Sequence, residues 1–183
     1  MQWKILSSEY LYQHPPYFIA RKDVCQRSDG HLIPAYYVVE LPPSVVIFPV
    51  VDDKVLMIKQ YRHPVKQISW ELPGGFVDNN ETGIAAAQRE LEEETGYVFD
   101  NYKQLGKIAG NPGILNNFTD VFVATGSHIK GIQNFEINEE IEIQMLSFDE
   151  IIQMLNQNKI IQSLHANACY MALIHLGKLQ YIK

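Results

Sequence analysis

The segment 75–96 constrains this chain more than any other, because four of the five residues from 90 to 94 are glutamates and a glycine stands at each end of the segment. Asn79 or Asn80 can cap a helix, three consecutive alanines follow, and Gly96 suits the left-handed residue that often ends a helix. The pattern predicts a helix from about residue 81 to 95. That helix would carry an unusual density of negative charge.

The acidic residues of this helix are expected to converge. Glu90 and Glu94 are one turn apart and Glu93 lies beside them, so three carboxylates share a face. Arg89 is the only cation near them, and like charges at this spacing cost a helix about 0.2–0.5 kcal/mol per pair. A bound Mg²⁺ or Mn²⁺ would offset that repulsion, because both ions prefer hard oxygen ligands. The alternative is a solvated acidic face, which describes most glutamate-rich helices.

The spacing of glycines, acids and arginine resembles the Nudix box, a pattern that fixes eight positions over 22 residues. The matching residues are Gly75, Glu81, Arg89, Glu90, Leu91, Glu93, Glu94 and Gly96. Tyr97 departs from the family pattern, which favours an aliphatic residue there. The resemblance implies a divalent metal site, Mg²⁺ or Mn²⁺, whose ligands would be the Gly74 carbonyl and the side chains of Glu90, Glu93 and Glu94.

The resemblance also implies that Arg89 serves catalysis by orienting the carboxylates of the site, Glu93 and Glu81 among them. Glu81 and Arg89 are about two helical turns apart, so this role comes from the family and not from helix geometry. The alternative is a surface ion pair between Arg89 and Glu93, which are four residues apart.

Three further segments resemble the ADP-ribose and nucleotide-sugar pyrophosphatase branch of the family. They read QYRHP at 60–64, WELPGG at 70–75 and GNPG at 110–113. On this basis Arg62, Glu71 and Pro112 are candidate substrate-binding residues, and a guanidinium such as that of Arg62 can bind phosphate through two hydrogen bonds. The alternatives are an exposed strand charge for Arg62 and a plain turn residue for Pro112.

The resemblance implies metal-dependent hydrolysis of a diphosphate bridge, most directly that of ADP-ribose to AMP and ribose 5-phosphate. GDP-mannose or another nucleoside diphosphate sugar is the alternative substrate, and a nucleotide sensor without catalysis is the alternative function. In this branch a loop glutamate beyond the box takes the proton from water, and Glu139 is favoured here, followed by Glu140 and Glu136. Each could instead be a charge that keeps a sheet edge soluble.

The remaining pattern predicts an α/β (α+β) protein, a Nudix-type α/β/α sandwich on a mixed sheet preceded by a small antiparallel sheet. Residues 1–42 are expected to form three strands, and 43–183 the Nudix domain. Because a lone three-stranded sheet is marginally stable, it must pack on either the next domain or a second copy of the chain, and the resemblance implies a homodimer that exchanges this sheet. The expected segments are strands 3–8, 17–26, 32–40, 44–51, 54–61, 102–109, 120–124 and 141–146, and helices 149–156 and 160–176.

Composition limits the partners and the compartment. The 183 residues, 46% of them hydrophobic, suffice for one domain with a small appendage, and the net charge of −6 argues against a nucleic-acid partner. Cys25 and Cys169 are isolated in sequence, so we expect reduced thiols in a cytoplasmic protein. Because charged and polar residues interrupt the first ten residues, we expect no signal peptide there. The longest apolar stretch, around 45–51, is strand-length and contains Pro49, so no membrane span is expected.

Overall fold

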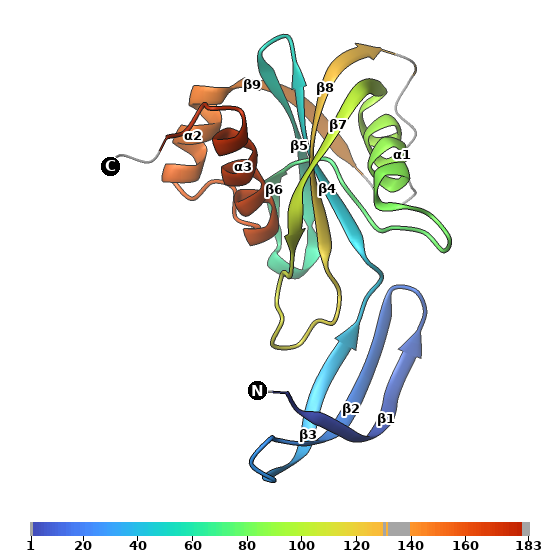
Figure 1. Ribbon diagram of the computed structural model, residues 1–183. Coiled ribbons are helices and arrows are strands. Elements are labelled where there is room, and N and C mark those ends of the chain that lie inside the picture. The colour runs from blue at the N-terminus through green and yellow to red at the C-terminus, as the bar shows by residue number, and fades with distance from the viewer. Residues whose placement is uncertain (1, 130, 132–139, 181–183) are drawn as a thin grey trace. The chain divides into compact units, whose positions relative to one another are not determined.

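The computed structural model describes residues 2–129, 131 and 140–180, and these residues form two compact units (Figure 1). The first unit combines Met1–Pro43 with Ala109–Phe118. The second combines Ser44–Ile108 with Thr119–Lys183. The sequence boundary near residue 42 therefore separates two groups of contacts, but one loop from the later part of the chain clusters with the N-terminal residues.

The first unit contains a three-stranded antiparallel sheet in the order β1, β2, β3. Its strands are β1 (Lys4–His14), β2 (Phe18–Gln26) and β3 (Leu32–Glu40). The β2–β3 turn forms where Ser-Asp-Gly predicts it, and Gly30 adopts a positive φ of 87° there. All residues of β1 are exposed, including Ile5, Leu6 and Leu11. Leu6 and Leu11 each lie where the register between β1 and β2 is irregular, so the regular alternation of faces is interrupted at both positions.

The loop Ala109–Phe118 is tied to the N-terminal sheet by hydrogen bonds from β3. The Val39 N–H donates to the Ile114 carbonyl at 2.8 Å, and the Tyr36 hydroxyl donates to the Gly113 carbonyl at 3.1 Å. The Asn116 side chain accepts from the Leu41 N–H at 3.0 Å. These bonds join residues more than 70 positions apart, which explains why this loop clusters with the first unit.

The second unit is an α/β/α sandwich. Its elements are β4 (Ser44–Val51), β5 (Lys54–Arg62), a short 3₁₀ turn η1 (His63–Val65), β6 (Gln67–Glu71), α1 (Gly83–Thr95), β7 (Tyr97–Ile108), β8 (Thr119–Ile129), β9 (Ile141–Ser147), α2 (Phe148–Asn156) and α3 (Ser163–His175). The strands follow the order β6, β5, β4, β8, β7, and β9 pairs with β5. Strands β4 and β8 are parallel and the other pairs are antiparallel, so the predicted mixed sheet is confirmed.

The sheet of the second unit separates two apolar cores. Helix α1 covers one face, and α2 and α3 cover the other (Figure 1). Leu91 of α1 packs in the core beside Ile47 and Ile58, whereas Ile151 of α2 and Leu173 of α3 pack in the core beyond the opposite face. All five side chains are at most 1% exposed. Among the described helices, none has both the length and the apolarity that crossing a membrane requires.

Several element boundaries differ from the sequence-based prediction. Helix α1 begins at Gly83, with Thr82 as its N-cap, because the Thr82 hydroxyl accepts a hydrogen bond from the Ala85 N–H. The prediction of Asn79 or Asn80 as the cap was wrong, since Asn80 lies in a preceding turn with a φ of 67°. Strand β6 was not predicted. Strands β7 and β8 are longer than predicted, and α3 begins three residues later than predicted.

Candidate active site

The Gly74–Gly75 segment lies beside β4, in a space that β5 leaves open. Strands β4 and β5 pair only next to their connecting turn, at Val50–Val55 and Val51–Lys54. Farther along β4, the Val45 N–H donates to the Gly75 carbonyl and the Ile47 N–H donates to the Pro73 carbonyl, each at 2.9 Å. The glycine segment is therefore held as an extra stretch of sheet against a buried strand.

The Gly74 N–H points away from β4 and toward helix α1. It donates to Glu94 Oε2 at 3.0 Å, and Glu94 is only 4% exposed. In an extended segment the N–H and C=O of one residue point to the same edge, so the Gly74 carbonyl shares the edge that faces Glu94. A β-carbon at Gly74 would lie 2.3 Å from the Val45 carbonyl oxygen, so only glycine fits this position.

Gly75 allows close approach of the Glu90 carboxylate. A β-carbon at Gly75 would lie 2.3 Å from Glu90 Oε1 and 2.7 Å from Glu90 Oε2. The two glycines thus have different neighbours: Gly74 abuts the backbone of β4, and Gly75 abuts the movable end of an acidic side chain. Together they let two carboxylates of α1, Glu90 and Glu94, reach the same short piece of backbone.

Arg89 lies at the centre of the acidic cluster. Its guanidinium donates to Glu81 at 3.0 and 3.1 Å, to Glu90 Oε1 at 2.9 Å and to Glu93 Oε2 at 3.0 Å. It also donates to the Phe76 carbonyl at 2.9 Å. The contacts with Glu81 most strongly raise the pKa of Arg89, and the hydrogen bonds from Arg89 hold the pKa of Glu81 below its usual value.

The sequence offered two interpretations of Arg89, an ion pair with Glu93 and a contact with several carboxylates of the site, and the structure contains both kinds of contact. The i, i+4 pair with Glu93 forms, and the same guanidinium also links Glu81 to Glu90. Arg89 therefore ties the loop before α1 to the acidic stripe of the helix. Such a link restricts where the Glu90 and Glu93 carboxylates can lie, and the role of Arg89 in catalysis stays a prediction.

The carboxylates of this cluster are suited to a hard divalent cation. Glu90 and Glu93 both accept hydrogen bonds from the same Arg89 nitrogen, Nη1, while Glu94 accepts one from the Gly74 N–H. Within the part of the chain that the structure describes, no three acidic, histidine or cysteine side chains are arranged to hold a metal ion. The metal-ligand set therefore stays a prediction. Its support is the oxygen-only donor set and the glycine pair that a β-carbon would obstruct.

Arg62 and Glu71 form a second charged element of the site. The Arg62 guanidinium donates two hydrogen bonds to the Glu71 carboxylate, at 2.9 and 2.6 Å. The Glu71 side chain is 1% exposed and that of Arg62 is 42% exposed. Burial alone would raise the pKa of Glu71, but the hydrogen bonds from Arg62 hold that pKa below its usual value. The Glu71 carboxylate is thus enclosed and contacts Arg62, and its predicted place among the substrate-binding residues stays a prediction.

His165 of α3 also contacts this element, and sequence reasoning gave it no role. The Leu72 N–H donates to His165 Nδ1 at 2.9 Å, and His165 Nε2 lies 3.5 Å from Glu71 Oε2. The histidine is 93 positions from Leu72, and no local pattern marks it in the sequence.

The remaining predicted residues fall in three places. Pro112 is exposed in the loop that clusters with the first unit. Glu140 is exposed immediately before β9. Glu136 and Glu139 lie outside the described residues. The identity of the general base stays a prediction.

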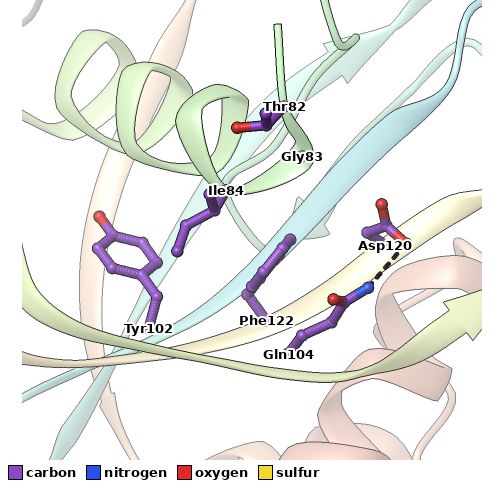
Figure 2. Close-up of a pocket in the computed structure, with 7 residues that line it drawn as sticks. All are labelled: Thr82, Gly83, Ile84, Tyr102, Gln104, Asp120 and Phe122. Atoms are coloured by element: carbon purple, nitrogen blue, oxygen red, sulfur yellow. Dashed lines mark hydrogen bonds between the residues drawn. The ribbon is translucent and has the colours of Figure 1, made fainter.

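A separate hollow of about 390 Å³ lies at the start of α1 (Figure 2). It is lined by Thr82, Gly83, Ile84, Tyr102, Gln104, Asp120 and Phe122. Asp120 accepts a hydrogen bond from Gln104 at 3.0 Å and pairs with Lys107 at 3.4 Å, so its charge is balanced locally. Burial raises the pKa of Tyr102 to about 12, so its hydroxyl is neutral at ordinary pH. None of the predicted site residues lines this hollow.

Two protein-family models match the chain, in segments that follow one another. A family model described as NUDIX domain matches residues 40–165, and one described as nucleoside diphosphate sugar hydrolase N-terminal domain matches residues 3–39. Over 117 residues the chain is 28% identical to an ADP-ribose pyrophosphatase of Bacillus subtilis (strain 168) and 30% identical to a methanol dehydrogenase activator of Bacillus methanolicus. Each match covers 63% of either chain, so the chain spans less than two thirds of these relatives' length.

A solved structure shows the same fold. The structure described as an ADP compounds hydrolase superposes with a TM-score of 0.84 at 20% sequence identity. The match covers 98% of this chain and 98% of that chain. The small antiparallel sheet followed by a mixed-sheet sandwich is therefore an arrangement that occurs in a known protein.

Proposed function

The chain belongs to the Nudix family, and on that premise we propose that it hydrolyses the diphosphate bridge of a nucleoside diphosphate sugar. ADP-ribose, cut to AMP and ribose 5-phosphate, is the leading substrate. The observation that carries the reaction type is the acidic helix α1 against the glycine segment, where Glu94 binds the Gly74 N–H and Glu90 abuts Gly75. The match of residues 3–39 to a nucleoside diphosphate sugar hydrolase domain, and a relative named ADP-ribose pyrophosphatase, favour the substrate class.

The residues for a divalent cation, Mg²⁺ or Mn²⁺, would be Glu90, Glu93, Glu94 and the Gly74 carbonyl. When bound, such an ion would neutralise phosphate charge and acidify a water molecule. Arg89 would keep two of these carboxylates in place through its shared hydrogen bonds. Glu139, or Glu140 or Glu136 near it, would accept the proton of the attacking water.

Arg62 would bind a phosphate of the substrate. Its guanidinium is partly exposed, while two of its hydrogen bonds go to the buried Glu71 carboxylate. A guanidinium fixed in this way loses little freedom when it binds a phosphate oxygen, so its orientation is largely prepared before substrate arrives.

Product analysis over a panel of substrates tests this proposal. ADP-ribose, GDP-mannose, ADP-glucose and NADH are incubated with Mg²⁺ or Mn²⁺, and the products are separated by chromatography. We expect AMP and ribose 5-phosphate from ADP-ribose, at the highest kcat/KM of the panel. A higher kcat/KM for GDP-mannose than for ADP-ribose would make GDP-mannose the leading substrate. If none of the four compounds were turned over in a metal-dependent way, the result would favour a nucleotide-binding sensor without catalysis.

Gly75→Ala should reduce activity with little loss of stability. The new β-carbon would displace the end of the Glu90 side chain, which can rotate away at an expected cost of about 1 kcal/mol. Because Glu90 would then leave its position beside the glycine segment, kcat/KM is expected to fall about 10- to 100-fold. Steady-state kinetics and urea unfolding measure the two effects. Wild-type kcat/KM in this variant would contradict the assigned place of Glu90.

We also propose that the chain is a homodimer joined through the β1–β3 sheet. Large apolar side chains are exposed on β1, among them Ile5 at 59%, Leu6 at 53% and Tyr12 at 57%. An isolated sheet of this size is marginal, and a second copy of the chain would cover these side chains.

Equilibrium sedimentation tests the dimer. The wild-type protein at micromolar concentration is expected to sediment at twice the 21.0 kDa of one chain. Leu6→Glu should shift the protein toward the monomer, because a charge would enter an apolar interface. Ile129→Glu is the matched control, since Ile129 of β8 is 72% exposed and lies in the other unit. A monomeric wild type, or a Leu6→Glu protein that stays dimeric, would contradict the proposed interface.

A further inference from the structure

His165 joins α3 to the backbone that leads into the glycine segment. It is 7% exposed, and its two ring nitrogens have different partners. Nδ1 accepts the 2.9 Å hydrogen bond from Leu72, and Nε2 lies 3.5 Å from the Glu71 carboxylate. Because a neutral imidazole has one acceptor and one donor nitrogen, Nε2 carries the proton and faces Glu71. One side chain therefore contacts both a backbone amide and a buried acid.

The imidazole acts here as a neutral group. Burial lowers the pKa of His165 to about 4, although the nearby Glu71 carboxylate opposes that effect. Arg62 is therefore the cation that balances Glu71 at neutral pH. The contribution of His165 comes from the positions of its two nitrogens and not from a positive charge.

The Leu72 N–H lies on the edge of the backbone that faces away from β4, as the Gly74 N–H does. Pro73 and Gly75 direct their carbonyls to β4, so Leu72 and Gly74 direct their N–H groups to the opposite edge. There the Leu72 N–H meets His165, and the Gly74 N–H meets Glu94. One helix from each side of the sheet thus fixes the backbone on either side of Pro73.

The other buried residues of α3 perform ordinary packing. They are Ala168, Cys169, Ala172 and Leu173, and all belong to the apolar core between α3 and the sheet. An apolar side chain at position 165 could add to that core, but it would leave the Leu72 N–H without an acceptor. The polar contacts of His165 therefore set it apart from its neighbours on the helix.

We propose that His165 is a positioning residue for the hydrolysis proposed above, holding the Gly74 carbonyl through Leu72 and the Arg62 guanidinium through Glu71. Its two nitrogens would serve two separate parts of the site. The contact through Nδ1 fixes the backbone two residues before the expected carbonyl ligand. The contact through Nε2 supports the acid that orients the expected phosphate-binding arginine. This inference rests on the proposed function.

Two substitutions separate these contacts. His165→Asn places an amide oxygen near the position of Nδ1, so it can still accept from Leu72 but does not reach Glu71. His165→Gln extends to the position of Nε2 and can donate to Glu71, but it leaves no acceptor at Nδ1. Leu173→Ala is the matched control, because Leu173 is buried on the same helix at 0% exposure and its side chain has no polar atom that could bond to the Leu72 N–H or the Glu71 carboxylate.

Two measurements then distinguish positioning from packing. Calorimetric titration of each protein with Mn²⁺, without nucleotide, reports the metal site, and steady-state kinetics with ADP-ribose report KM and kcat. His165→Gln should weaken Mn²⁺ binding about 10-fold. His165→Asn should raise KM about 10-fold with nearly unchanged Mn²⁺ binding. Leu173→Ala should lower the melting temperature and leave Mn²⁺ binding and KM close to wild type.

The possible outcomes keep this inference distinct from the proposed function. If the wild type cleaves ADP-ribose and both His165 variants match Leu173→Ala in Mn²⁺ binding and KM, the positioning role is refuted while the function stands. If the wild type cleaves no compound of the panel, the function fails. In that case the Mn²⁺ titration of His165→Gln still decides whether His165 supports the metal site.

Discussion

Glu94→Gln is expected to lower kcat/KM for the diphosphate substrate by about 10²- to 10³-fold while the fold is retained. Glu94 is 4% exposed, and its Oε2 accepts the Gly74 N–H at 3.0 Å. The amide oxygen of glutamine can accept the same hydrogen bond, so the glycine segment should keep its place. The substitution removes only the negative charge of the side chain. A divalent cation depends strongly on that charge for binding, whereas the hydrogen bond from the Gly74 N–H does not.

Glu92→Gln is the matched control for this result. Glu92 is on the same helix, and its charge acts on Tyr102 of β7, whose pKa it helps to raise. It is not part of the expected ligand set, so its neutralisation should leave kcat/KM close to the wild-type value. Steady-state kinetics with Mg²⁺ or Mn²⁺ and circular dichroism on all three proteins decide the matter. Full activity in Glu94→Gln would refute the assigned role of Glu94.

The local parts of the site were predictable from sequence. The stop at Gly96 is confirmed, because this residue has a φ of 72° and closes α1 through a hydrogen bond to Glu92. The spacing of Glu90, Glu93 and Arg89 on one helix follows from helical periodicity, and the structure joins them as that periodicity allows. The N-cap was less certain, since three of the four residues from 79 to 82 are asparagine or threonine and several of these can cap. The choice of Thr82 depends on how the preceding turn is packed.

The non-local parts were not predictable in the same way. Strand β6 is five residues long and lacks clear alternation of apolar and polar residues, so its pairing with β5 gives no strong local signal. The place of Gly74 beside β4 depends on the divergence of β5 from β4, which is a property of the whole sheet. The contact of His165 with Leu72 depends on how α3 packs, 93 residues later in the chain. Periodicity describes a segment alone and not its distant partners.

Gly74→Ala is expected to destabilise the protein by about 3 kcal/mol, which corresponds to a fall of roughly 6–12 °C in the melting temperature. The added β-carbon would lie 2.3 Å from the Val45 carbonyl oxygen and 3.0 Å from the Val46 α-carbon. Both obstacles are backbone atoms of a buried strand and cannot rotate away. The segment would have to leave β4, losing the hydrogen bonds to Pro73 and Gly75, and the Gly74 carbonyl would move with it. Turnover should therefore fall together with stability.

Two other glycine substitutions show whether this steric argument is correct. Gly177→Ala tests backbone conformation alone, because Gly177 has a φ of 68° and no atom within 4 Å of the added carbon, so a loss of about 1 kcal/mol is expected. Gly75→Ala meets only the end of the Glu90 side chain and should lose activity more than stability. Thermal unfolding and kinetics should thus rank Gly74→Ala lowest in stability. If Gly74→Ala unfolded at the same temperature as Gly177→Ala, the close packing of Gly74 on β4 would be refuted. The idea that β4 fixes the position of the Gly74 carbonyl would then fail as well.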